Sequence, residues 1–153
     1  ALPIYRSLQS FPSVIIVVLD SDDHDVQQFR SELEAVAMQN MIKIDHVFCL
    51  AVEEIEAWLL GDRHALLSAY PHAKMHVLNT YVQDSICGTW EVLADAVYPG
   101  GTSKLSREHA SFIEIGKLKA EWAQNIGIHM DLKSNESPSF NDFIHEIERR
   151  LVS

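Results

Sequence analysis

Four acidic residues within six positions are the part of this sequence best suited to chemistry. Asp20, Asp22, Asp23 and Asp25 follow directly after the apolar run 14–19. Two carboxylates about 4 Å apart repel by about 4 kcal/mol at an effective dielectric of 20, which would raise one pKa by about three units. A divalent cation removes that repulsion and gains oxygen ligands. The cluster therefore predicts a Mg²⁺ or Mn²⁺ site with Asp20, Asp22 and Asp23 as metal ligands.

The alternative role for aspartates at this place is helix capping. A carboxylate just before a helix accepts hydrogen bonds from its first free N–H groups and favours its positive end. We expect Asp23 or Asp25 to cap the helix that follows. Capping accounts for one carboxylate and leaves the others for metal binding.

A second acidic group, Glu53, Glu54 and Glu56, follows the apolar run 44–51. These glutamates also suit the first turn of a helix, where the dipole favours negative charge. Val52, Ile55 and Leu59 form the predicted buried stripe of that helix, which leaves the glutamates to face a crevice or solvent. Both interpretations remain open, and Glu54 and Glu56 are the candidate catalytic carboxylates.

A strand–helix–strand unit is expected to bring the two acidic groups together. Residues 13–19 are apolar on both faces, as in a buried strand of a parallel sheet. Residues 25–40 repeat apolar side chains at helical spacing, and residues 44–51 form a second strand. A right-handed crossover makes the strands parallel, so both acidic groups should lie at the carboxyl edge where α/β proteins bind ligands.

The rest of the chain is predicted to be mainly helical. Helices are expected at 54–60, from about 62, at 89–97, at 113–126 and at the C-terminus after Pro138. The sequence therefore predicts an α/β fold, with 1–61 carrying the acidic site, 62–153 a helical remainder, and 1–153 forming one domain. Lys117 and Lys119 flank a stripe of Leu118, Trp122 and Ile126. Lys117 is the candidate lysine for neutralising a phosphate.

Composition narrows the class of protein. The chain has 153 residues, 47% of them hydrophobic, which is enough for a globular core. Its net charge of −10 argues against a broad basic surface for nucleic acid. It does not argue against a metal-dependent nuclease whose partner supplies the basic surface. Without a bilayer-length apolar run or a secretory signal, a cytoplasmic protein without a membrane partner is expected.

Other catalytic motifs are missing from the sequence. Cys49 and Cys87 give neither a disulfide framework nor a zinc pattern, and His72 and His76 have no third zinc ligand at a sensible distance. A Gly-x-Ser-x-Gly elbow and a phosphate-binding glycine loop are also absent. His24 beside the aspartates is more typical of a polar loop than of a proton carrier.

Three segments resemble a bacterial domain-of-unknown-function family related to the TOPRIM superfamily, which includes topoisomerases, primases and the overcoming-lysogenization-defect nucleases. They are Leu-Asp-Ser-Asp-Asp at 19–23, Ala-Val-Glu-Glu-Ile-Glu-Ala-Trp-Leu-Leu at 51–60 and Asn-Glu-Ser-Pro-Ser-Phe at 135–140. The likeness covers nearly the whole chain. It implies a Rossmann-like small parallel sheet flanked by helices.

The resemblance also implies a function. TOPRIM domains bind Mg²⁺ through an Asp-x-Asp pair, which corresponds to Asp20 and Asp22, and Glu54 and Glu56 would support that site. They also use a glutamate after an earlier strand. That strand is not visible in this sequence, because the chain starts too close to Ser13 to supply it, and residues 2–8 resemble the end of a helix. The implied activity is phosphodiester cleavage, with an ATPase partner in phage defence.

Two alternatives stand beside this nuclease hypothesis. The first is a non-catalytic regulatory or interaction module that keeps a degenerate TOPRIM-like fold. The second is a phosphotransfer domain, such as a haloacid-dehalogenase-like phosphatase or a receiver, which also places aspartates at a strand end. Ser21 between the aspartates argues against the phosphatase.

Overall fold

A computed structural model describes residues 14–151, which form a mixed α/β structure with a small parallel sheet. Within this range there are two strands and eight helices. They are β1 (Val14–Asp20), α2 (Val26–Gln39), β2 (Asp45–Ala51), α3 (Glu56–Gly61), α4 (Arg63–Ala69), α5 (Met75–Leu78), α6 (Thr89–Val97), α7 (Gly101–Arg107), α8 (Phe112–Gly127) and α9 (Pro138–Leu151). The helix end predicted at 2–8 lies outside the described residues.

The predicted strand–helix–strand unit is confirmed. β1 and β2 pair in parallel over their whole length, from Val14 opposite Asp45 to Asp20 opposite Ala51. Between them, Asp25 caps α2 because its side chain accepts a hydrogen bond from Gln28 N at 2.9 Å. Both strands therefore end at the same edge, and the acidic residues follow them there.

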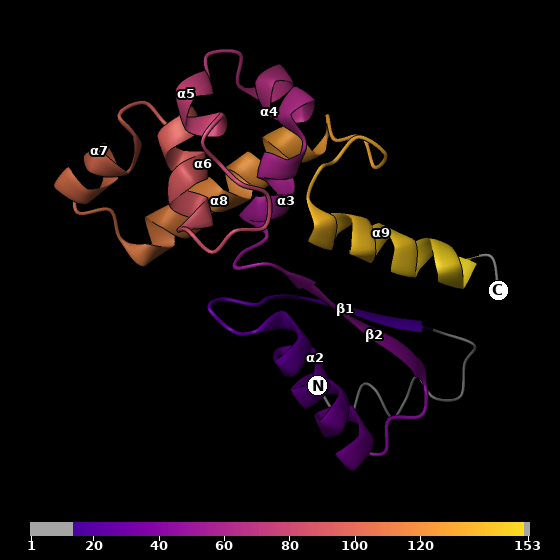
Figure 1. Ribbon diagram of the computed structural model, residues 1–153. Helices are drawn as coiled ribbons and strands as arrows, with labels where there is room; N and C mark the ends of the chain where they lie inside the picture. Colours follow the sequence, from indigo (N-terminus) through magenta and orange to yellow (C-terminus); the bar gives the residue numbers. More distant parts are fainter. Residues whose placement is uncertain (1–13, 152–153) are drawn as a thin grey trace.

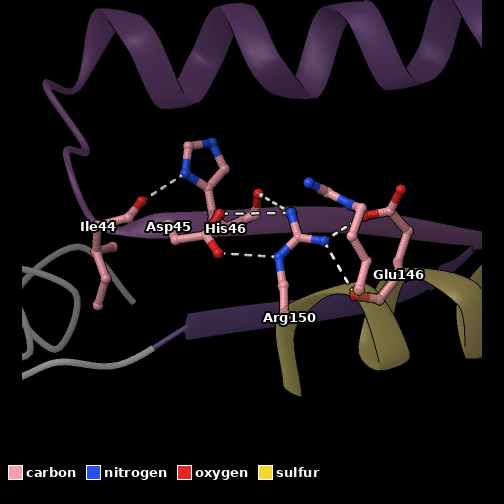
Figure 2. A network of polar contacts seen from close by, with 6 residues as sticks. Ile44, Asp45, His46, Glu146 and Arg150 are labelled. Carbon is pink, nitrogen blue, oxygen red and sulfur yellow. Dashed lines mark hydrogen bonds and ion pairs between the residues drawn. The ribbon is translucent and has the colours of Figure 1, made fainter. Parts of the chain in front are cut away.

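Two helices lie on opposite sides of the sheet, α2 on one and α9 on the other (Figure 1). Both pack against β2. The end of α9 is fastened to the start of β2 by Arg150, whose guanidinium donates to Asp45 Oδ2 at 3.0 Å and to the Glu146 carbonyl at 3.1 Å (Figure 2). It also pairs with the Glu146 carboxylate.

The helices α3 to α8 form a separate cluster beyond the carboxyl ends of the strands (Figure 1). Its core includes Leu66, Leu93 and Ile126, none of which has exposed surface. Helices α5 and α7 were not predicted. α7 starts at Gly101, and positive φ angles at Gly100 and Gly101 form the tight turn into it.

The segment 135–140 joins the helical cluster to α9 by buried hydrogen bonds. Trp58 Nε1 donates to Ser139 Oγ at 2.9 Å, and Asn135 Nδ2 donates to the Trp58 carbonyl at 2.8 Å. Ser137 Oγ donates to Asp84 Oδ1 at 2.7 Å. Because these polar groups satisfy one another inside the protein, this part of the sequence has a structural role.

β1 is less buried than its sequence predicts. Its residues are apolar on both faces, yet none is fully buried, and Val14 and Ile16 are 40% and 36% exposed. Among the described residues β1 pairs only with β2. Its other edge is not paired by any residue of the range 14–151. None of the helices in the described range is both long and apolar enough to cross a bilayer.

Candidate functional site

The two acidic loops meet just beyond the strand ends, as the parallel unit predicts. Ser21 is fully buried, and its Oγ accepts a hydrogen bond from Glu53 N at 2.9 Å. Asp22 N donates to the Glu53 carbonyl at 2.9 Å, so the two residues form a short antiparallel bridge. Both have positive φ, 48° and 60°. This pairing holds loops that are thirty positions apart in one fixed arrangement.

Asp20 lies at the centre of the edge. Its Oδ1 accepts a hydrogen bond from Ile55 N at 2.9 Å, which ties the end of β1 to the second loop. Partial burial raises the pKa of Asp20, and the nearby Glu54 and Asp22 carboxylates add to the rise. The Ile55 amide and Lys119 oppose it without cancelling it. Negative charge at Asp20 is therefore incompletely compensated.

Both carboxylate oxygens of Glu53 accept hydrogen bonds from the start of α6. Its carboxylate accepts hydrogen bonds from the backbone N–H groups of Cys87, Gly88 and Thr89 at 3.2, 2.8 and 2.8 Å, and from the Thr89 hydroxyl. Burial alone would raise the pKa of Glu53, but these hydrogen bonds outweigh it and the pKa is lowered. Glu53 thus caps a helix whose own N-cap residue, Gly88, has no side chain.

Glu54 and Glu56 share one lysine. Lys119 Nζ lies 2.9 Å from Glu54 Oε1 and 3.2 Å from Glu56 Oε2. Glu56 is buried, which raises its pKa in spite of Lys119. Burial alone would lower the pKa of Lys119, but its bond to Glu54 and the charge of Glu56 raise it overall. The lysine is therefore held as an ammonium among carboxylates.

Two sequence expectations for this loop need correction. Ile55 was expected in the buried stripe but is 37% exposed, whereas Glu56, expected to face a crevice or solvent, is 2% exposed. The reason is that α3 begins only at Glu56. Residues 53–55 form a turn, so helical periodicity does not describe them.

Lys117, the lysine chosen from the sequence, is exposed and has no ion pair among the described residues. Lys119, two residues further on, is the lysine of α8 that contacts the glutamates Glu54 and Glu56. The signal for it was present, because Lys119 lies three and seven positions before Trp122 and Ile126, the two buried residues of α8. A charged residue on the buried face of a helix requires a buried counter-ion.

A cavity of about 250 Å³ opens at this edge and is lined from both acidic loops. Glu91, on α6, adds a carboxylate with one buried oxygen that has no hydrogen-bond partner. Burial raises the pKa of Glu91, and Glu54 and Glu53 add to the rise. The lining residues are Asp22, Asp23, Glu53, Glu54, Ile86, Gly88, Trp90 and Glu91.

The predicted metal ligands lie near one another but do not form a preformed metal site. Asp22 and Asp23 are exposed on the first loop, and Asp20 is bonded to the second. Within residues 14–151, no three side chains of His, Cys, Asp or Glu are arranged to hold a metal ion. Both cysteines are free thiols, Cys49 buried and Cys87 exposed.

Comparisons with protein-family models, with curated proteins and with solved structures gave no match to this chain. The resemblance to TOPRIM proteins therefore depends on the three sequence segments alone. What the chain does has to be argued from its own residues.

Proposed function

We propose that the acidic edge is a Mg²⁺-dependent site for phosphodiester cleavage, in a TOPRIM-like domain. One observation carries the proposal: carboxylates from both strand ends line one cavity, and one of them, Glu54, contacts the ammonium of Lys119. Cleavage of a phosphodiester needs a cation-binding acidic group and a positive charge near the phosphate. Both meet at Glu54.

The chemistry of these donors suits a hard divalent cation. Mg²⁺ prefers oxygen ligands, keeps several waters and takes one or two carboxylates together with substrate phosphates, so a full protein cage is not required. Asp20, Asp22 and Asp23 would hold the ion from the first loop and Glu54 from the second. Burial raises the pKa of Asp20, and one buried oxygen of Glu91 has no hydrogen-bond partner, so a cation bound between these groups would favour the charged form of both carboxylates.

Lys119, Glu54 and Glu56 have separate roles in this proposal. A bound divalent cation supplies two things, activation of water and compensation of charge on the phosphate. Lys119 provides a second positive charge, and Glu56 keeps it in place from a buried position. Glu54 is bonded both to Lys119 and to Trp90 N, at 3.1 Å, so its carboxylate is held on the cavity side of α6.

The metal site is tested by titrating the chain with Mg²⁺ and Mn²⁺ in a calorimeter. The double variant Asp20→Asn with Asp22→Asn should lose the binding heat that the unchanged protein gives. Glu148→Gln should keep it, because Glu148 is an exposed carboxylate near the end of α9 that Arg150 fastens to the start of β2. Equal binding by all three proteins would remove the metal site from these residues.

The cleavage role is tested by comparing the two lysines of α8. Lys119→Met should lower metal-dependent cleavage of a labelled oligonucleotide by about 100-fold, as expected for loss of one group that stabilises transition-state charge. Lys117→Met should retain it. Because Lys119→Met leaves Glu56 buried without its partner, the variant Lys119→Met with Glu56→Gln checks that lost activity is not lost folding. Normal cleavage by both Lys119 variants would contradict the role.

A partner protein is part of the same proposal. With a net charge of −10 the chain repels nucleic acid over most of its surface, so an ATPase partner with a basic surface would deliver the substrate, as in phage-defence systems. Cleavage by the chain alone should then depend only weakly on salt, because few lysines and arginines can release counterions from the phosphates. A steep loss of cleavage with added salt would show that the chain itself makes the basic contacts and would argue against such a partner.

The second candidate is a non-catalytic module, and one observation favours it. Glu53 is satisfied by backbone N–H groups, while Glu54 and Glu56 are neutralised by Lys119, so these carboxylates stabilise the loop without any metal. Such a module would bind a partner protein and leave nucleic acid intact. Robust Mg²⁺-dependent cleavage by the chain, lost in the aspartate double variant, eliminates this candidate.

A further inference from the structure

Trp90 differs from the other two tryptophans of the chain. Trp58 and Trp122 are core residues, 7% and 2% exposed. Trp90 is only partly buried: it packs against the core of the helical cluster and also lines the acidic cavity. An aromatic ring that is supported by the core and borders a cavity can offer a surface to a flat ligand.

A second cavity adjoins the acidic one at this residue. It measures about 320 Å³ and lies between α6, α7 and the start of α8. Trp90 and Glu91 line both cavities, so the two cavities adjoin at these residues, and we refer to them together as the groove. The other lining residues are Thr102, Leu105, Ser106, His109, Ala110 and Ile115.

The two ends of this groove have different chemistry. The acidic end carries four carboxylates besides that of Glu91. The far end carries none, and combines hydroxyls and an imidazole with apolar side chains. Nucleotides have the same division, with a charged phosphate and a flat base that offers hydrogen-bonding edges. The acidic end would take the phosphate with its cation, and the far end would take the base.

Trp90 is also fixed at the right place for this task. The backbone N–H of Trp90 donates a hydrogen bond to Glu54 Oε2 at 3.1 Å. The backbone N–H of the preceding residue, Thr89, donates to the Glu53 carboxylate. The backbone of Trp90 is therefore fixed in the first turn of α6, next to the carboxylate that contacts Lys119. The ring projects from this fixed backbone and borders both cavities.

We propose that Trp90 is the stacking platform for an unpaired nucleobase, and that the substrate of the acidic edge is single-stranded nucleic acid. This inference rests on the proposed function, which it deepens by naming the substrate class. Bases inside a duplex already stack on one another and cannot reach a side chain, whereas bases of a single strand stack on aromatic rings whatever their sequence.

The test measures binding of fluorescent dT10 and rU10, and of a duplex of equal length, with Mg²⁺ and with EDTA. Trp90→Leu should weaken binding of the single strands by about tenfold, the usual effect of losing one stacked base. Trp90→Phe should keep most of it. The matched control is Phe112→Leu, because Phe112 is an aromatic residue 93% exposed and lines neither cavity. The duplex should bind more weakly than either single strand.

A second measurement avoids any loss of folding in the variants. Added dT10 should quench the tryptophan fluorescence of the unchanged protein, since Trp58 and Trp122 are buried. The inference is overturned if Trp90→Leu binds normally, if the duplex binds best, or if neither single strand binds or quenches. Its failure is distinguishable from failure of the proposed function. Trp90-dependent binding without cleavage removes only the nuclease, and cleavage that is indifferent to Trp90 removes only the stacking site.

Discussion

At the scale of single residues, neighbouring carboxylates with the same chemistry have different roles. Glu53 caps a helix, Glu54 links a helix to a lysine, and Glu56 is a buried anion paired with that lysine. Which role each takes depends on the turn at 53–55, where Glu53 has positive φ. The sequence alone gives no reason to separate them.

Glu53 is expected to stabilise the protein. Glu53→Gln keeps the size of the side chain but loses the charge that several N–H groups and the Thr89 hydroxyl share. Since hydrogen bonds to a charged group contribute more than neutral ones, the free energy of unfolding should fall by about 2 kcal/mol. Urea denaturation at pH 7 measures it. Glu121→Gln, on the exposed face of α8, should change little, and equal stability of both variants would contradict the role.

The same residue gives a pH dependence with a definite sign. The folded-state pKa of Glu53 is lowered from its usual 4.5, so its stabilisation is fully present above that value and is lost as the pH falls through the folded-state pKa. Burial raises the pKa of Asp20, Glu56 and Glu91, and these groups work in the opposite direction. The measurement is therefore the difference between the unchanged protein and Glu53→Gln, which should shrink as the pH falls below about 4. A constant difference would contradict the assignment.

Part of the site was predictable at this scale and part was not. The spacing of apolar residues and the parallel pairing of the strands predicted that the aspartates after β1 and the glutamates after β2 lie at the same edge of the sheet. They did not predict Ser21, whose buried hydroxyl receives the Glu53 amide, or the cap on α6, because both depend on contacts between distant segments. Lys119 could have been preferred to Lys117, since it shares the face of Trp122 and Ile126.

At the scale of helices and strands, most elements followed from periodicity. The spacing of apolar residues located α2, α6, α8 and α9 to within a few residues. Either Asp23 or Asp25 was expected to cap α2, and Asp25 does so. The helix α7 was missed because its first residue is Gly101, which usually ends a helix. It forms because the Asp95 carboxylate accepts hydrogen bonds from Thr102 N and Oγ1 at 2.7 and 2.8 Å.

The joint between α3 and α9 should tolerate no added volume at Gly61. A Cβ there would lie 2.1 Å from Asn135 Oδ1 and 2.9 Å from Ser137 Cβ. Asn135 cannot withdraw easily, because it bonds both the Trp58 carbonyl and Ser137 N. We expect Gly61→Ala to lower the free energy of unfolding by about 2 kcal/mol, as in other overpacked cores.

A matched control exists for this substitution. Gly116 lies inside α8, and a Cβ there would meet no atom within 4 Å. Gly116→Ala should therefore raise the free energy of unfolding by up to about 1 kcal/mol, the difference in helix propensity between the two residues. Chemical denaturation of both variants gives the comparison. Similar effects at the two positions would mean that the joint is not closely packed.

At the scale of the whole molecule, the sheet and the helical cluster differ in how fully their apolar side chains are buried. The cluster encloses a core with several fully buried side chains. In the part of the chain that the structure describes, the sheet has two strands, and both helices that flank it pack on β2. Ile15 and Val17 line an apolar cavity of about 180 Å³ beside α2, while Val14 and Ile16 remain exposed. β1 has the sequence of a central strand in the position of an edge strand.

An open, apolar edge strand is a template for pairing with another chain. We therefore expect the 153-residue chain to self-associate through β1 as its concentration rises, in sedimentation or light-scattering measurements. Ile16→Lys places a charge on the exposed side of the strand, where it can stay in water in the monomer but not beside a second strand, and should shift the chain toward monomer. Met38→Lys, on α2 at a residue 76% exposed, adds the same charge away from the strand and should leave association unchanged. Equal effects of the two lysines would assign the association to net charge, and a monomeric unchanged chain at all concentrations would mean that the edge of β1 is already protected.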